Sequence, residues 1–183
     1  MSTVTRETRE TRVRVFLRAR GTPDAARIQT GEPFLDHMLL ALARYAGLEL
    51  QVTASGDLRH HLIEDVAITL GMALRKEVPD ACARYGSATI PMDDALVHAA
   101  LDAGGRCYYR GPVPSALYQH FLRSLAEHAG LTLHVRVLRG RDRHHVVEAA
   151  FKALGLALRQ ALAPEGAVFS TKGSVAVSGE DEQ

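Results

Sequence analysis

The hydrophobic residues of the chain follow two different periods, one after the other. From residue 34 to residue 46, apolar side chains recur every three to four positions, which predicts a helix with one buried face. Gly47 comes next and is typical of a residue that ends a helix. Residues 48–54 then alternate between apolar and polar, which predicts a strand with one buried face, and residues 62–73 return to a helical stripe. The pattern therefore predicts a helix, a strand and a second helix.

The same order of patterns returns about 84 residues later. Residues 131–137 alternate as a strand, and residues 146–157 carry the second helical stripe. With a shift of 83 or 84 residues, His37 falls on His120, and Glu64 falls on Glu148. Further strands are predicted at residues 13–17, 28–30, 88–90 and 96–101. We therefore expect an α+β fold from an internally duplicated chain: a single domain of two similar lobes, about residues 1–84 and 85–173, with a flexible tail at 174–183.

Composition and charge exclude several classes of protein. The 183 residues suffice for one domain or two half-size lobes, and 22 basic against 21 acidic residues give a net charge of +1. Since no long run of one charge occurs, we expect no nucleic-acid or membrane-surface partner. No apolar stretch reaches 18 residues, so we expect no membrane span and a cytoplasmic location. Cys82 and Cys107 have no CxxC spacing, and both are expected to be buried free thiols.

Two repeated His-His pairs carry the strongest chemical signal. His60-His61 precedes Glu64 and His144-His145 precedes Glu148, so a histidine four or three residues earlier shares a helical face with each glutamate. Adjacent histidines point about 100° apart on a helix, so one helix start could supply two ions, and the two copies could exchange ligands. Imidazole with carboxylate suits divalent first-row metals, which leaves Mn²⁺, Fe²⁺ and Zn²⁺ open.

Other residues give weaker signals on their own. The unrepeated histidines His98, His128 and His134 are expected on the surface or hydrogen-bonded in the core. Arg84, Arg106 and the segment 170–173 are candidate anion ligands, because guanidinium binds phosphate through two hydrogen bonds and lysine supplies a point charge. Taken alone, an arginine is more often a solvated surface charge than a ligand, and residues 6–11 are equally typical of a charged strand edge.

The residues together resemble a known family. Residues 30–38 read TGEPFLDHM, and HHxxED, HHxxEAAFKAL and STKG follow; this series resembles imidazoleglycerol-phosphate dehydratase. The resemblance implies a hydro-lyase that converts imidazole-glycerol phosphate to imidazole-acetol phosphate plus water in histidine biosynthesis, with manganese and without an organic cofactor. It also implies a layer of four helices between two four-stranded sheets. Self-association into trimers and a 24-subunit shell, with active sites at subunit contacts, is implied as well.

The resemblance assigns site residues one by one. Two Mn²⁺ ions per subunit are implied, the first held by His37, His61, His144 and Glu148, and the second by His60, Glu64, His120 and His145. The opening residues Arg6, Thr8, Glu10 and Thr11 match the family's motif, which makes Glu10 the acid/base residue beside the catalytic carboxylates Glu64 and Glu148. Substrate and phosphate contacts are implied for Arg84, Arg106, Ser170 and Lys172. The turn at residues 56–60 and the span 106–120 are shorter than the family's usual pattern.

The chemistry of the reaction motivates a mechanistic hypothesis. The proton to be removed does not neighbour a carbonyl, so an electron sink is required, and an imidazolate bound by two metal ions could expel hydroxide. Glu10 would then transfer the neighbouring proton. Two other functions stay open at this point. A non-catalytic di-metal storage or structural protein would not need Glu10, Arg84, Arg106 or Lys172, and a two-metal phosphoester hydrolase would favour bridging carboxylates and release phosphate.

Overall fold

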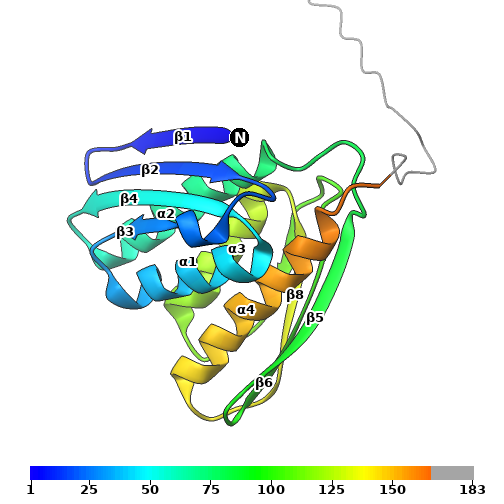
Figure 1. Cartoon of the computed structure of the whole chain (residues 1–183). Helices are drawn as coiled ribbons and strands as arrows, with labels where there is room; N and C mark the ends of the chain where they lie inside the picture. Colours follow the sequence, from blue (N-terminus) through cyan, green and yellow to red (C-terminus); the bar gives the residue numbers. More distant parts are fainter. Residues whose placement is uncertain (166–183) are drawn as a thin grey trace, which may run out of the picture.

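The computed structural model describes residues 1–165 of the chain as two β-sheets with helices between them (Figure 1). The candidate phosphate contacts Ser170 and Lys172, and the predicted tail at residues 174–183, lie outside the described residues.

The first half of the chain forms one mixed sheet and two helices. Its strands are β1 (Ser2–Glu7), β2 (Thr11–Arg18), β3 (Arg27–Gln29) and β4 (Glu49–Gly56), in the spatial order β1-β2-β4-β3. Strand β2 is antiparallel to both β1 and β4, whereas β3 runs parallel to β4. A 3₁₀ turn (Pro23–Ala25) precedes β3, and the helices are α1 (Pro33–Ala46) and α2 (Arg59–Arg75). Along β2, Val13 and Val15 are buried whereas Arg12 and Arg14 are exposed, as the alternation predicted.

The second half repeats this order of elements. Strands β5 (Tyr85–Met92), β6 (Ala95–Asp102), β7 (Tyr108–Arg110) and β8 (Thr132–Arg139) lie in the order β5-β6-β8-β7, and β7 runs parallel to β8. The helices are α3 (Ala116–Ala129) and α4 (Arg143–Ala161). Gly47 and Gly130 end α1 and α3 with φ values of 70° and 69°, a conformation that glycine adopts without steric cost. The predicted α+β fold from a duplicated chain is confirmed.

The helices of the two halves pack against each other between the sheets. Helix α2 lies on the first sheet and α4 on the second, while α1 packs on α4 and α3 packs on α2 (Figure 1). Phe121 and Phe151 meet in the core with ring centroids 5.3 Å apart. Every helix that carries a repeated histidine or glutamate therefore touches a helix of the other half, which is the condition for the two copies to share ligands.

Two edge strands and one thiol differ from what the sequence predicted. Strands β1 and β7 were not predicted, because β1 is rich in threonine and charge and β7 has three residues. Cys82 is buried, but Cys107 is exposed, so the expectation of two buried thiols is wrong for Cys107. Among the described helices, none is long and apolar enough to cross a bilayer. The second sheet begins at Tyr85, next to the predicted boundary between the halves, which itself stays a prediction.

Candidate metal centres

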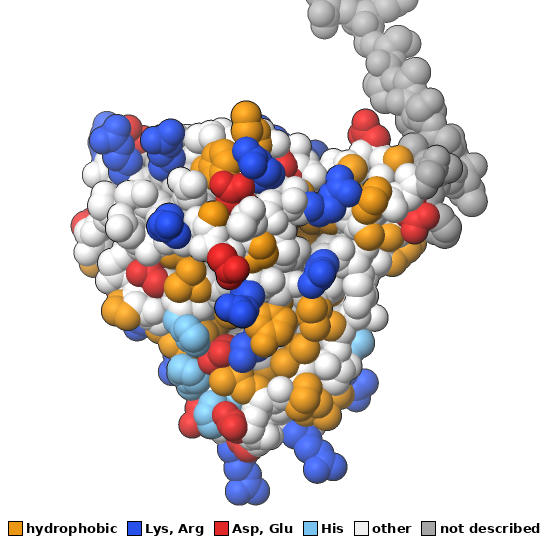
Figure 2. Space-filling view, in the orientation of Figure 1, with side chains coloured by type: hydrophobic (Ala, Val, Ile, Leu, Met, Phe, Trp, Pro, Cys, Tyr) orange, Lys and Arg blue, Asp and Glu red, His pale blue; other side chains and the backbone are white. Residues whose placement is uncertain are grey.

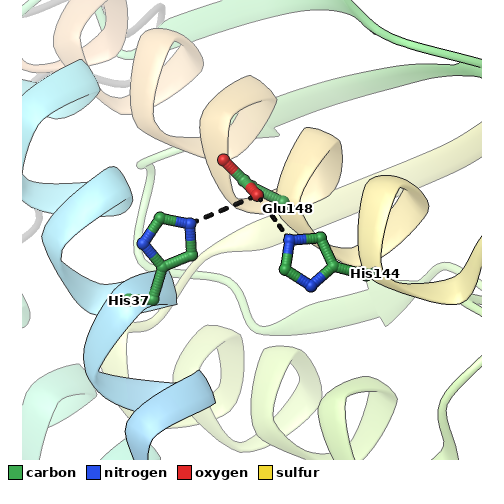
Figure 3. Close-up of side chains that lie close together, drawn as sticks. All are labelled: His37, His144 and Glu148. Carbon is green, nitrogen blue, oxygen red and sulfur yellow. Dashed lines mark hydrogen bonds and ion pairs between the residues drawn. The ribbon is translucent and has the colours of Figure 1, made fainter.

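One cluster of potential ligands joins α1 to α4. His37 comes from α1, and His144 and Glu148 come from α4. The Nε2 atoms of His37 and His144 lie 3.3 and 3.1 Å from Oε2 of Glu148, and Figure 3 shows both rings directed at this carboxylate. We call these three residues the α1–α4 cluster. It combines ligands of both halves, as the exchange of ligands required.

Local structure fixes the two α4 members of this cluster. His144 and Glu148 are one helical turn apart, so their side chains project from the same face. Asp142 caps the helix and accepts hydrogen bonds from the backbone nitrogens of His144 and His145 at 2.7 and 3.4 Å. The ring of Phe34 packs on that of His144, with centroids 5.1 Å apart. These contacts limit the positions that the His144 ring can take.

A second cluster joins α2 to α3 in the equivalent way. His60 and Glu64 come from α2 and His120 from α3. Nε2 of His120 lies 3.0 Å from Oε1 of Glu64, and Nε2 of His60 lies 3.8 Å from Oε2. The rings of His60 and His120 are stacked with centroids 5.3 Å apart. We call these residues the α2–α3 cluster; each member has its counterpart in the α1–α4 cluster at the repeat shift.

The donor sets of both clusters fit a divalent metal ion. In each cluster the three ligand atoms lie within 4.8 Å of one another. Atoms bound about 2.1 Å from one ion are about 3.0–3.5 Å apart, close to most of the distances found. Two imidazoles and one carboxylate suit first-row divalent ions. Five of the six side chains are between 33% and 60% exposed, and that of Glu148 is 6% exposed, so ions can reach both clusters from solvent.

The two cluster carboxylates have different surroundings. Nζ of Lys152 lies 2.8 Å from Oε1 of Glu148. Burial raises the pKa of Glu148, but the hydrogen bond and charge of Lys152, together with His37, bring it below its usual value. The repeat shift places Ile68 where Lys152 stands, and the Glu64 side chain is 33% exposed. Glu148 is thus held as an anion by a neighbouring lysine, and Glu64 faces solvent.

The second histidine of each pair lies outside the clusters within one chain. Nδ1 of His61 lies 2.9 Å from Oε2 of Glu10, and with Asp57 these residues form a third group of potential ligands. Nδ1 of His145 lies 2.8 Å from Oδ1 of Asp94. The structure therefore brings together three of the four residues in each predicted set. The fourth residue, His61 in one set and His145 in the other, is turned away from them.

Glu10 and Asp94 occupy equivalent places in the two halves. Both lie in a turn between two strands, 84 residues apart, and both face the second histidine of a pair. Hydrogen bonds from the Arg141 backbone, His145 and the Asp142 backbone lower the pKa of Asp94 to about 2. The hydrogen bond to Asp94 raises the pKa of His145. Glu10 has no such backbone donors among the contacts of the described residues.

Two of the predicted phosphate contacts, Arg84 and Arg106, lie at the far end of α4. The backbone nitrogen of Arg84 donates to the oxygen of Ala161, the last residue of this helix, which is about 27 Å long. The guanidinium of Arg84 binds Asp102 through two hydrogen bonds of 2.7 and 3.0 Å, and Arg106 lies 3.8 Å from the same carboxylate. The hydrogen bond from Arg84 lowers the pKa of Asp102. Within one chain, these arginines are therefore remote from His144.

A cavity opens beside the α1–α4 cluster. Its volume is about 420 Å³, within the usual range for small-molecule sites. His37, Glu148, Lys152, Leu40 and Tyr45 are among the lining residues. In Figure 2, histidine and acidic side chains gather over the start of α4, next to an apolar area with basic residues. A small molecule bound in this cavity would therefore contact an apolar wall, a lysine and members of the α1–α4 cluster.

The unrepeated histidines are outside all the ligand groups of residues 1–165. His98 bonds to Thr89 and His128 to the backbone of Ser124, both at 2.8 Å, and His134 packs on Tyr108. His98 and His128 are thus hydrogen-bonded and His134 is exposed, as the sequence led us to expect.

Sequence reasoning missed two residues of the site. Lys152 stands four residues after Glu148, a helical pairing that the sequence already contained. Asp94 stands one repeat after Glu10, but the search for identical residues passed over it because the two acids differ. A comparison by charge at the repeat shift would have found Asp94.

Comparisons with known proteins cover most of the chain. A family model described as imidazoleglycerol-phosphate dehydratase matches residues 30–158. The protein of that name from Methanoculleus marisnigri is 46% identical over an alignment of 192 positions, gaps included. The alignment spans 95% of this chain and 98% of that protein. The one from Pyrobaculum calidifontis is 49% identical over 185 residues, spanning 92% and 96%.

Two solved structures are similar to the fold. The crystal structure of IGPD from Pyrococcus furiosus in complex with (S)-C348 superposes with a TM-score of 0.86 and 41% identity, covering 94% of this chain and 100% of that chain. The imidazoleglycerol-phosphate dehydratase of Staphylococcus aureus gives a TM-score of 0.78 at 30% identity, covering 90% and 100%. Sequence and structure comparisons thus point to one family.

Proposed function

The chain belongs to the imidazoleglycerol-phosphate dehydratase family of hydro-lyases in histidine biosynthesis, and on that premise we propose that it is a metal-dependent dehydratase with two metal ions per subunit. It converts imidazole-glycerol phosphate to imidazole-acetol phosphate plus water. The observation that carries the metal dependence is the pair of equivalent clusters, each with two histidines and one glutamate. The reaction is a biosynthetic step, and we place it in the cytoplasm.

Four residues hold each ion in this proposal. The α1–α4 cluster takes His61 as its fourth ligand, and the α2–α3 cluster takes His145. Because both histidines are turned away from the clusters of their own chain, we propose that a neighbouring subunit supplies them. The His-rich sets with one carboxylate each suit Mn²⁺ as well as Fe²⁺ or Zn²⁺, and Mn²⁺ is the ion proposed. When bound, the ions supply Lewis-acid stabilisation of negative charge on the substrate's imidazole ring.

Glu10 is the acid/base residue of the proposed reaction. Its carboxylate is exposed on the β1–β2 turn, and its contact with Nδ1 of His61 at 2.9 Å supports this role, because His61 is one of the proposed metal ligands. It removes the proton from the substrate carbon next to the one that loses hydroxide, and the resulting enol becomes the ketone by proton transfer. A carboxylate in this role contributes about 10²- to 10⁴-fold to the rate.

The phosphate of the substrate is bound by cations from another part of the shell. Arg84 and Arg106 lie near Ala161, so in this proposal they serve the cluster of a neighbouring subunit, together with Ser170 and Lys172. This arrangement requires assembly, which we propose to be trimers joined into a 24-subunit shell. Asp102 holds the Arg84 guanidinium in one orientation before phosphate arrives.

The test of this function is turnover by metal-stripped protein before and after addition of Mn²⁺. Imidazole-acetol phosphate is assayed as the product, with inorganic phosphate measured in the same samples. The proposal predicts product only with metal and no phosphate release. Phosphate release would instead favour a phosphoester hydrolase, and binding of two ions without any turnover would favour metal storage.

Assembly has its own test by size-exclusion chromatography with light scattering, with and without Mn²⁺. The proposal predicts a mass near that of 24 chains with metal. A monomer under both conditions would contradict ligands shared between subunits.

A further inference from the structure

The position of Glu10 depends on how the β1–β2 turn is held against α2. Glu10 belongs to the turn, and His61, which it faces, belongs to the helix. The backbone bond from the Asp57 nitrogen to the Glu10 oxygen is 3.2 Å long and ties the turn to the loop before α2. Three residues, 8 to 10, make up the turn between the two strands, and further contacts hold it and so bear on the distance from Glu10 to His61.

One buried carboxylate makes these contacts. Asp65 is 8% exposed and stands one helical turn after His61, on the same face of α2. Its Oδ2 atom lies 2.6 Å from Nη1 of Arg6 and accepts the hydroxyl hydrogen bond of Thr11. Arg6 lies in β1 and Thr11 begins β2, so one oxygen atom holds both strands beside the turn.

The turn itself is closed by a second hydroxyl. Oγ1 of Thr8 accepts hydrogen bonds from the backbone nitrogens of Glu10 at 3.1 Å and Thr11 at 3.0 Å. It also lies 3.0 Å from Oγ1 of Thr11, so the closure of the turn connects to Asp65 through Thr11. Gly56 permits the close approach, because a Cβ atom there would lie 3.0 Å from the Thr11 methyl group. The chain of contacts runs without a break from α2 to the backbone of Glu10.

Within residues 85–165, the second half of the molecule has no counterpart of this network. The repeat shift places Ile90, Ala95 and Ala149 where Arg6, Thr11 and Asp65 stand. There the turn acid is fixed through its own carboxylate, because Oδ2 of Asp94 accepts from the Arg141 and Asp142 nitrogens at 2.6 and 3.1 Å. Holding the turn through Asp65 instead leaves the carboxylate of Glu10 with His61 as its close partner within residues 1–165.

We propose that Asp65 is a positioning residue for the reaction: with Arg6 and Thr11 it fixes the β1–β2 turn on α2 and so sets Glu10 at its working distance from His61. This inference rests on the proposed function of Glu10. It explains why the opening segment combines an arginine and two threonines with the glutamate, since all three take part in the contacts that hold Glu10.

The test compares Asp65→Ala and the near-isosteric Thr11→Val with wild-type protein. The matched control is Glu77→Gln: Glu77 follows α2 and accepts from Ala19 at 3.1 Å and from the Met1 amino group at 2.8 Å, so it ties the opposite end of the same hairpin. For each full-length protein we would measure kcat, KM and bound Mn²⁺. Backbone hydrogen exchange of Glu10 and Thr11 would be measured in the metal-free proteins.

We expect Asp65→Ala to lower kcat about 10- to 100-fold, with KM and bound Mn²⁺ within threefold of wild type, because a shift of about 1 Å in a catalytic group has this effect. Thr11→Val should lower kcat by a smaller factor. Exchange at Glu10 and Thr11 should quicken at least about tenfold in both variants, and in Glu77→Gln neither kcat nor this exchange should change.

Two results would overturn the proposal. One is unchanged exchange at the turn together with near-normal kcat in Asp65→Ala. The other is an equal fall in kcat and in bound metal, with an equal change in KM, in Asp65→Ala, Thr11→Val and Glu77→Gln. That result would make the network a general support of the fold. Absence of turnover in the wild type would refute the proposed function, and the exchange data would still decide whether Asp65 holds the turn.

Discussion

The α1–α4 and α2–α3 clusters have the same three ligand types at equivalent positions, but they differ in what surrounds their carboxylate. Glu148 is buried and paired with Lys152. The side chain of Glu64 is a third exposed, and Ile68 occupies the position that Lys152 has beside Glu148. The acids that face the second histidines differ as well. Asp94 is bound by two backbone nitrogens, whereas the turn that bears Glu10 is held through Asp65.

The candidate ligands are equivalent in the two halves, whereas the residues that contact and hold them are not. Helical spacing keeps the ligands equivalent, since a histidine and a glutamate four residues apart on a helix always share a face. The supports come from other elements and differ between the halves. One half thus holds a buried anion and an acid bound by backbone nitrogens, while the other has a more exposed carboxylate and an acid that contacts His61. The two halves thus share candidate ligands and differ in the groups around them.

Removing the turn acids should give the largest contrast between the halves. We expect Glu10→Gln to bind substrate and lower kcat at least about 10²-fold, because it removes a proton-transfer group. Asp94→Ala should weaken Mn²⁺ binding about tenfold through loss of the His145 contact, with kcat at saturating metal reduced less than tenfold. Steady-state kinetics and metal titration measure both. Near-normal kcat in Glu10→Gln would remove Glu10 from its role.

The two cluster carboxylates should differ in their effect on stability. In metal-free protein at pH 7, we expect Glu148→Gln to lower the free energy of unfolding by about 2–3 kcal/mol, because the ammonium of Lys152 stays largely buried without a counter-charge. Glu64→Gln should cost less than about 1 kcal/mol. Urea unfolding in chelator measures these values.

A double variant checks the cause of this difference. Lys152→Met with Glu148→Gln should recover much of the stability lost in Glu148→Gln. Equal losses in the two single glutamate variants, or no recovery in the double variant, would show that the contrast between the clusters has no energetic consequence.

The far end of the second half should act on substrate binding rather than on the chemical step. Arg106 is exposed and lies 3.8 Å from Asp102, so its charge is open to a phosphate. We expect Arg106→Ala to raise KM about tenfold with kcat within threefold of wild type, as for loss of one charged contact. The exposed Arg110→Ala serves as a control, and an unchanged KM in Arg106→Ala would reassign the phosphate contact.

The ion pair at that end should also make stability depend on pH. The hydrogen bond from Arg84 lowers the pKa of Asp102 in the folded protein, so the pair contributes stability above the unfolded-state pKa of about 4 and loses it as the pH falls through the folded value. We expect Asp102→Asn to be about 1–2 kcal/mol less stable than wild type at pH 7, a difference that shrinks towards pH 3. Unfolding curves at several pH values measure it, with the exposed Asp24→Asn as a control. A difference that is constant with pH would show that the charge of Asp102 is not involved.

Much of the fold was predictable because one face of most elements is buried. The inward residues Val13, Val15 and Leu17 of β2 alternate with the outward residues Arg14 and Phe16, and α1 to α4 carry apolar stripes, so periodicity identified them. Strand β7 has three residues, too few for a period to show. Strand β1 has exposed threonines and charges at an edge, where burial does not constrain the sequence.

The site was predictable as far as it lies on helices. The repeat shift and the spacing of histidine and glutamate indicated both clusters, because helical geometry converts sequence spacing into proximity. It did not indicate that His61 and His145 turn away to Glu10 and Asp94, since these contacts are made across turns that come from distant strands. The network of Asp65 was missed for the same reason.

The most direct test is the number of Mn²⁺ ions bound per chain by wild type, His37→Ala and His120→Ala. Each protein is equilibrated with a small excess of Mn²⁺, and gel filtration then removes the unbound metal. The account holds that the two clusters are separate metal sites, so it predicts two ions in the wild type and one in each variant, with two in the control His98→Ala. Two ions in either cluster variant, or the loss of both ions from one of them alone, would contradict it.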